Sequence, residues 1–309
     1  QYQSFQFQPA LVISNLKGVG ILNAGRITLQ DVCVSLPSSD ITVNGSLVNL
    51  QNPEFDLEFS ANPITTGDFY TFLDEAVPDT SVIINGSIAG GLSRTTGVLS
   101  GQLDSSRVEL AFEGALVPLD LHLTVVAQLG RLSSSPILSN DISVEVDGQI
   151  VADTHIDTTG LRNLRARAQL ENIKWGRLLQ KEASFDVAFD DGNVSWHMTS
   201  SGTLGHIDLE GQYHVWSERG AVNGTFENLN LGMLPKQPSE IGKATGTVSV
   251  VVDTVWQASV GLKEITYDAQ FIQDLKTDFV YGGGRVDIRH FEAFLTGLET
   301  RLVGTGQVF

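Results

Sequence analysis

Residues 281–308 read YGGGRVDIRHFEAFLTGLETRLVGTGQV, and this stretch decides the fold. Apolar and polar side chains alternate on both sides of Arg289-His290, but the phase of the alternation shifts by one residue across this pair. Such a shift predicts a β-bulge or a tight bend inside a strand. A further alternating run from Leu302 to Val308 predicts a second strand that pairs with the first.

The same pattern recurs elsewhere in the chain. Residues 25–47, GRITLQDVCVSLPSSDITVNGSL, show the phase shift across Gln30-Asp31, and a looser copy lies at 192–213. Because a phase shift fixes the register of two neighbouring strands, its recurrence predicts a repeated β unit. We expect copies near 18–50, 185–215 and 279–309 within one continuous module over residues 1–309. Since the strand pattern reaches both ends, we also expect this module to be a fragment of a longer chain.

Alternation continues through nearly the whole sequence, and its longest clean run extends from Leu119 to Leu129. Together these runs predict about twenty strands, each with one apolar and one polar face. Neither the continuous apolar strands nor the intervening helices of a parallel sheet are visible. The sequence therefore predicts an all-β fold, an elongated and curved antiparallel sheet with a U-shaped, taco-like groove. A few short helices are expected at 67–73, 173–179 and 229–234, each after an asparagine-containing turn.

Glycine recurs within the strands, in phrases such as ITVNGSL at 41–47 and IDLEGQY at 207–213. In each copy the glycine falls on the apolar face, where a side chain would otherwise project inward. A row of such glycines would let the strands curl around a concave apolar interior, and valine in their place should overpack it. The structural glycines predicted in this way are Gly45, Gly86, Gly114, Gly211 and Gly306.

Composition limits the classes of function. The formal net charge is −17, from 36 acidic against 19 basic side chains. This charge argues against nucleic acid as a partner, because nucleic-acid binding is driven by cationic side chains. It also argues against docking on anionic headgroups through a basic surface. The single cysteine, Cys33, excludes a disulfide within the chain and is best explained as a small apolar strand residue.

No motif for catalysis, a cofactor or a metal stands out. The six histidines do not occur at HxH or HxxxH spacing, and each is expected on a polar face or in a turn. Asp190-Asp191-Gly192 lacks the later ligands of a calcium loop and predicts a hairpin turn. The triple glycine at 282–284 is not followed by the Lys-Ser/Thr of a phosphate loop. We therefore expect a protein that is not an enzyme and uses no cofactor.

The two copies at 25–47 and 281–308 resemble the repeat of the AsmA/TamB superfamily, and so do three connecting phrases: FDLEFSANPITTGDFYTFL, ARAQLENIKWGRLL and GTFENLNLGMLP. This resemblance implies an elongated antiparallel sheet with an apolar groove in the envelope of a Gram-negative bacterium. It also implies a periplasmic location, attachment to the inner membrane through a segment absent from this chain, and movement of phospholipid towards the outer membrane. Envelope membrane proteins would then be partners at its ends. The family has no catalytic residues to carry over.

Two functional hypotheses remain open from the alternation. In the first, the apolar face lines a conduit that holds the acyl chains of phospholipid or another lipid. In the second, the apolar faces close on each other as a dry sandwich in a structural or interaction module of the cell envelope or surface. The recurrent glycines favour the conduit, because a sandwich core would need bulk at these positions. The candidate lipid-lining residues are Phe55, Leu57, Phe59, Leu121, Leu123, Ile207, Leu209, Val286 and Ile288.

Overall fold

The computed structural model describes residues 12–49, 51–65, 67–68, 81–103, 105–133, 144–175, 178–230, 232, 242–253, 255–267, 270–282, 285–295 and 300–308. These residues are almost entirely antiparallel β-strand, so the predicted all-β fold class is confirmed. No helix among them is long and apolar enough to cross a membrane. The predicted helical residues 69–73 lie outside the described ranges.

The chain divides into two units, Gln1–Arg162 and Asn163–Phe309, and each is described by itself. The strands of the first unit are β1 (Asn15–Asn23), β2 (Arg26–Ser35), β3 (Asp40–Val48), β4 (Glu54–Thr65), β5 (Ser81–Gly91), β6 (Arg94–Leu103), β7 (Ser106–Ala115), β8 (Asp120–Ser133) and β9 (Val144–Asp157). Each pairs antiparallel with the next strand in the chain, so the first unit is a meander.

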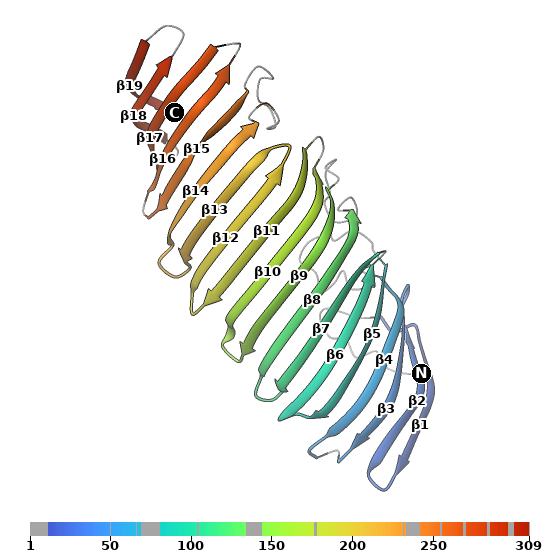
Figure 1. Cartoon of the computed structure of the whole chain (residues 1–309). Coiled ribbons are helices and arrows are strands. Elements are labelled where there is room, and N and C mark those ends of the chain that lie inside the picture. The colour runs from blue at the N-terminus through green and yellow to red at the C-terminus, as the bar shows by residue number, and fades with distance from the viewer. Residues whose placement is uncertain are drawn as a thin grey trace. The chain divides into compact units, whose positions relative to one another are not determined.

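The second unit repeats this plan. Its strands are β10 (Gly160–Trp175), β11 (Leu178–Asp190), β12 (Asn193–Gly202), β13 (Gly205–His214), β14 (Arg219–Asn230), β15 (Lys243–Val252), β16 (Trp256–Tyr267), β17 (Gln270–Gly282), β18 (Arg285–Leu295) and β19 (Thr300–Val308). They also pair antiparallel in chain order. Figure 1 shows the strands of each unit side by side in sequence order and bent along their length.

Short turns join many of these strands, as the sequence predicts. Asp191 and Gly192 both have positive φ, 44° and 81°, and connect β11 to β12. This is the two-residue hairpin geometry that favours Asp-Gly. The interpretation of Asp190-Asp191-Gly192 as a hairpin turn is therefore confirmed. Ala24 and Gly25, with φ of 47° and 80°, make the same kind of turn between β1 and β2.

Both predicted bulges are present. The pairing of β2 with β3 shifts between Leu29 and Val32, around Gln30-Asp31. Asp31 has φ of 49°, and its backbone N–H donates to Asn44 Oδ1 at 2.6 Å, so the bulge is held from the neighbouring strand. The second bulge lies in β18, where the pairing with β19 shifts between Ile288 and Phe291.

The copy at 192–213 differs from the other two, because β12 and β13 pair without any register shift. One predicted helix is also wrong. Residues 173–175 end β10 and pair with residues 178–180 of β11, so the described residues of this stretch are paired strand. Asn172, with φ of 52°, bends a strand here instead of starting a helix. Of the other predicted helical stretches, residues 67–68 form a 3₁₀ turn and Leu229 lies in β14.

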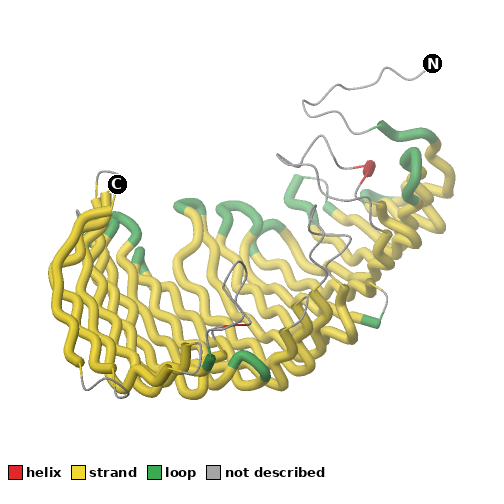
Figure 2. Tube along the Cα trace, turned by 90° about the horizontal axis from the view of Figure 1, so that it is seen from above, coloured by secondary structure: helices red, strands yellow, loops and turns green. Residues whose placement is uncertain are grey.

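The sheet in each unit has a single layer in the described residues, and few side chains are fully buried. The largest side chain with almost no exposure is Thr95. Phe226, Ala244 and Ile265 form a small core in the second unit. Figure 2 shows the described residues as strands joined by short loops. Strand pairing, rather than a deep core, therefore holds each unit together. Among the described residues, the buried hydrophobic ones are Leu36, Ala61, Ala127, Phe226, Ala244, Ala258, Ile265 and Ala293.

Candidate lipid-binding face

The apolar side chains of the first unit line up across neighbouring strands. Directly paired residues of an antiparallel sheet lie on the same face, so the register defines continuous cross-strand rows. We call the following two rows, with their neighbours, the apolar face of the first unit. One row is Val43, Phe59, Gly86, Leu99, Leu110, Val125 and Ala152, and the next is Gly45, Leu57, Ile88, Gly97, Phe112, Leu123 and Thr154.

Five candidate lipid-lining residues belong to this face. Leu57 and Leu123 lie in one row, and Phe59 lies in the adjacent one. Phe55 and Leu121 belong to a third row, which they share with Leu47, Thr95 and Gly114. Strands β4 and β8 are thus linked through paired residues on one face. All five side chains are half-buried.

Glycines on this face make room for aromatic rings. A Cβ built on Gly86 would lie 2.6 Å from Phe59 Cζ, and one on Gly97 would lie 2.2 Å from Phe112 Cζ. Each ring therefore covers the glycine of a neighbouring strand. Gly45 and Gly114 have φ of 134° and 143°, so their backbone itself favours glycine.

The second unit has an equivalent apolar face, which we define by two adjacent rows. Leu209 lies in one, and Gly211 and Ile288 lie in the other. The first row is Phe185, Met198, Leu209, Gly224, Val248, Val260, Thr277 and Phe291, and the second is Val187, Trp196, Gly211, Val222, Val250, Ala258, Phe279 and Ile288.

The remaining candidates lie beside these rows. Ile207 pairs with Phe226 and packs against the small core, whereas Val286 pairs with Tyr281. Ile207, Leu209, Val286 and Ile288 are all half-buried. The structure brings the candidates together within each unit, on the face that the alternation indicates.

Sequence reasoning treated Gly211 and Gly306 as equivalent, and the structure separates them. A Cβ on Gly211 would lie 2.3 Å from Cε2 of the Trp196 indole. Gly306 also lies on the apolar face, opposite Ile288, but a Cβ there would meet nothing within 4 Å. The prediction that Gly306 faces a crowded interior is therefore wrong, because β19 is exposed at this point.

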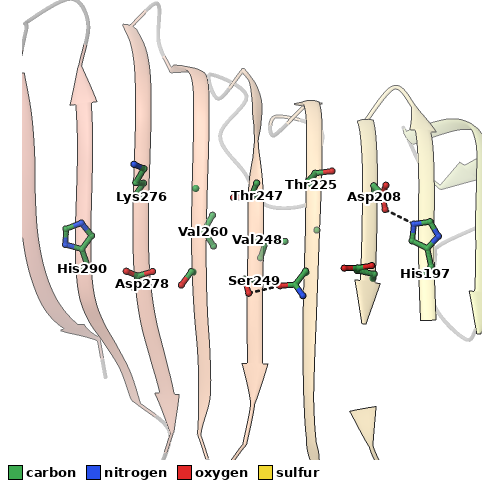
Figure 3. Close-up of a pocket in the computed structure, with 15 residues that line it drawn as sticks. His197, Asp208, Thr225, Thr247, Val248, Ser249, Val260, Lys276, Asp278 and His290 are labelled. Carbon is green, nitrogen blue, oxygen red and sulfur yellow. Dashed lines mark hydrogen bonds and ion pairs between the residues drawn. The ribbon is translucent and has the colours of Figure 1, made fainter. Parts of the chain in front are cut away.

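The opposite face of the second unit is polar and carries a shallow hollow of about 730 Å³. Figure 3 shows small side chains, such as Thr225, Thr247 and Ser249, between larger charged ones. His197 is hydrogen-bonded to Asp208 at 2.8 Å, and Lys276, Asp278 and His290 border the other side. Thr225, Thr247, Lys276 and Asp278 are exposed, so the hollow is open to water.

Hydrogen bonds and ion pairs lower the pKa of two carboxyl groups, those of Asp157 and Glu292. The side-chain hydroxyl and backbone N–H of Thr159 donate to Asp157, and with help from Arg162 they lower the pKa of Asp157 to about 2. Arg301, by a hydrogen bond at 2.8 Å, holds the pKa of Glu292 below its ordinary value. Both carboxyl groups are ionised at neutral pH, and their hydrogen bonds and ion pairs stabilise the local structure.

One cluster was missed by the sequence analysis. The imidazoles of His122 and His155 are stacked across β8 and β9, with ring centroids 4.2 Å apart. His155 Nε2 lies 2.7 Å from Asp120 Oδ1. His122 and His155 are distant in sequence, and only the strand register brings them together. The available signal was the pair of polar-face patterns Asp-x-His at 120–122 and His-x-Asp at 155–157.

Comparisons with protein-family models, with curated proteins and with solved structures found no match to this chain. The resemblance to the AsmA/TamB repeat therefore rests on the sequence phrases given above.

Proposed function

We propose that this chain is a non-enzymatic lipid-binding protein whose apolar faces hold acyl chains. One observation carries the proposal: all nine candidate lining residues are half-buried, although each lies on an apolar face. A dry sandwich would bury these side chains, because its two layers exclude water from each other. Continuous apolar surface that stays in contact with water is typical of a binding site.

Burial against the apolar rows would supply the favourable free energy for binding acyl chains. Each CH₂ group that leaves water contributes about 0.8 kcal/mol, so ten sheltered carbons contribute about 8 kcal/mol before ordering costs. The acyl chain would lie against leucine, valine and phenylalanine side chains, among them Leu57, Phe112 and Leu123. No covalent chemistry is required for this function.

The lipid headgroup would remain in water at the margin of the apolar face. Phospholipid is the lipid class that the AsmA/TamB resemblance suggests, and it also suggests transfer between inner and outer membranes in the periplasm. Envelope membrane proteins at the ends of the module would then deliver and receive the lipid. The acidic net charge of −17 gives no general attraction to anionic headgroups, so the acyl chains supply the affinity.

A structural or interaction module is the second candidate, and one observation favours it. Phe226, Ala244 and Ile265 are buried on the second unit, with Ile207 and Leu262 packed against them. This part of the face already has its own partners. A module that uses the remaining apolar residues to pack against another protein would carry no lipid.

A titration with a fluorescent phospholipid analogue tests the proposal. Leu209→Glu places a charge on the apolar face, whereas Thr247→Glu places one on the exposed polar face between the neutral residues Thr225 and Gly261. We expect Leu209→Glu to weaken binding at least about tenfold, since a carboxylate disfavours burial under an acyl chain. Thr247→Glu should bind like the parent protein. Equal binding by two folded variants would contradict the proposal.

A further inference from the structure

The Asp120, His122 and His155 side chains lie together on the polar face of the first unit. Asp120 and His122 are two residues apart on β8 and therefore project from the same face. His155 pairs directly with His122 from β9. One nitrogen or oxygen atom from each of the three side chains lies within 4.8 Å of the others.

This spacing is close to what a divalent transition metal needs. Zinc binds imidazole nitrogen and carboxylate oxygen at about 2.0–2.2 Å, which places neighbouring tetrahedral ligands about 3.3–3.6 Å apart. Asp120 Oδ1 and His155 Nε2 are 2.7 Å apart and would separate slightly around an ion. The Asp120 side chain is 60% exposed, so a change of rotamer can make this adjustment. The His122 and His155 rings are stacked nearly parallel, at 13°, so the exposed His122 ring would also turn to bring its nitrogen onto the same ion as that of His155.

Two features of the surroundings favour a cation. Glu113 of β7 pairs directly with His122 and adds a carboxylate beside the cluster. Asp153, which accepts a hydrogen bond from Thr124, lies two residues from His155 on the same face. Asp157 is opposite Asp120, but Thr159 and Arg162 already occupy its oxygens. Asp120, His122 and His155 are thus the ligand set, with space for water or Glu113.

We propose that Asp120, His122 and His155 form a binding site for one divalent transition-metal ion of the zinc class. The two imidazoles supply borderline nitrogen donors, which select zinc, cobalt, nickel or copper over magnesium and calcium. A bound ion would link β8 to β9 from the polar face and stabilise this hairpin. The site lies on the face opposite Leu121 and Leu123, so it is independent of lipid binding.

The test uses the whole chain without a histidine tag, freed of metal by a chelator. Calorimetric titration with Zn²⁺ should show one ion per chain, and Co²⁺ should give the intense visible absorption of a four-coordinate site with nitrogen ligands. His155→Ala and His122→Ala should each weaken Zn²⁺ binding at least about tenfold, because each removes one of three ligands. Circular dichroism checks that each variant retains its strands.

His197→Ala is the matched control. His197 also contacts an aspartate, Asp208, at 2.8 Å on a polar face, but among the described residues no other histidine is stacked on it. This variant should bind Zn²⁺ like the parent. The proposal is overturned by a parent protein that binds no Zn²⁺, or by folded His122→Ala and His155→Ala variants that bind as tightly as the parent. An equal loss of affinity in His197→Ala would also overturn it, since the ion would then bind histidines without selection.

Discussion

Gly211 and Gly306 show how strongly the surroundings of one residue type differ within the second unit. Both lie on the apolar face, and neither has a positive φ that would strain a side chain. The Trp196 indole lies directly over Gly211, whereas no atom is within 4 Å of the place where a Cβ of Gly306 would be. The two positions therefore separate steric crowding from backbone conformation.

We predict that Gly211→Ala lowers the free energy of unfolding by about 1–3 kcal/mol, because the new methyl group displaces the indole. Gly306→Ala should change it by less than about 0.5 kcal/mol. Urea denaturation followed by circular dichroism measures both. Equal midpoints for the two variants would show that Trp196 does not cover Gly211.

Asp157 gives a residue-scale prediction about pH. Its pKa is lowered to about 2, mainly by the Thr159 hydroxyl. Because the pKa is lowered in the folded state, the interactions of ionised Asp157 stabilise the fold at pH values above the ordinary pKa of about 3.8. This stabilisation is lost as the pH falls through about 2. In Thr159→Val, the pKa of Asp157 measured by NMR should rise towards its ordinary value. An unchanged pKa in that variant would assign the shift to the backbone N–H of Thr159, which the variant retains, and to Arg162.

At this scale, sequence reasoning identified which face a residue occupies and failed to identify its partner. The alternation placed Leu57 and Leu123 on an apolar face. It could not place His122 against His155, because cross-strand pairing depends on the connection between β8 and β9 and on their register. Whether a glycine such as Gly306 is crowded depends in the same way on neighbouring strands.

The bulge in β2 is the element that distinguishes the repeat copies from plain hairpins. Its backbone is held by a hydrogen bond from the Asp31 N–H to Asn44 Oδ1 on β3. Asn44 and Asn223 both precede a glycine in a similar phrase, but Asn223 accepts from the Ser249 side chain and holds no bulge. This makes Asn223 a matched control.

We predict that Asn44→Ala costs about 1 kcal/mol of unfolding free energy, since it leaves the Asp31 N–H without its acceptor. It should also speed hydrogen exchange of the Asp31 amide. Asn223→Ala should have a smaller effect on stability. Slow exchange at Asp31 in the Asn44→Ala variant would mean that the bulge holds without this contact.

The strands and their bulges were predictable because apolar and polar residues alternate with a period of two along the sequence, and each bulge shifts the phase of this alternation. The helix expected at 173–179 was wrong for a physical reason. Asparagine at 172 was interpreted as the start of a helix, but it occupies the left-handed region with φ of 52° inside a strand pair. Asn228 has the same φ, where β14 shifts its register against β15. Asparagine tolerates the left-handed conformation, so Asn172 and Asn228 both mark bends in strands.

At the scale of the whole molecule, both units repeat one plan: a meander with one apolar and one polar face. Alternation alone does not separate an open apolar face from a closed sandwich, because each buries one side of the sheet. The partial exposure of Phe55, Leu57 and Leu123 is the feature that supports an open face. This exposure depends on whether another layer of protein covers the apolar face. The local alternation of apolar and polar residues does not determine that.

We propose that acyl chains occupy the apolar faces. Leu57 and Ser60 provide a matched test on β4, because Leu57 lies on the apolar face and Ser60 is exposed on the polar one, between Thr42 and Asn85. Leu57→Glu should retain its β-strand content and lose lipid, whereas Ser60→Glu should retain both. The added charge is the same in both variants, so only the face differs.

The most direct measurement is organic extraction of the purified protein, followed by mass spectrometry of the phospholipid recovered per chain. The account predicts phospholipid in stoichiometric amount with the parent and with Ser60→Glu, and a large loss with folded Leu57→Glu. A folded parent protein that carries no lipid, or a Leu57→Glu variant that carries as much as the parent, would contradict it.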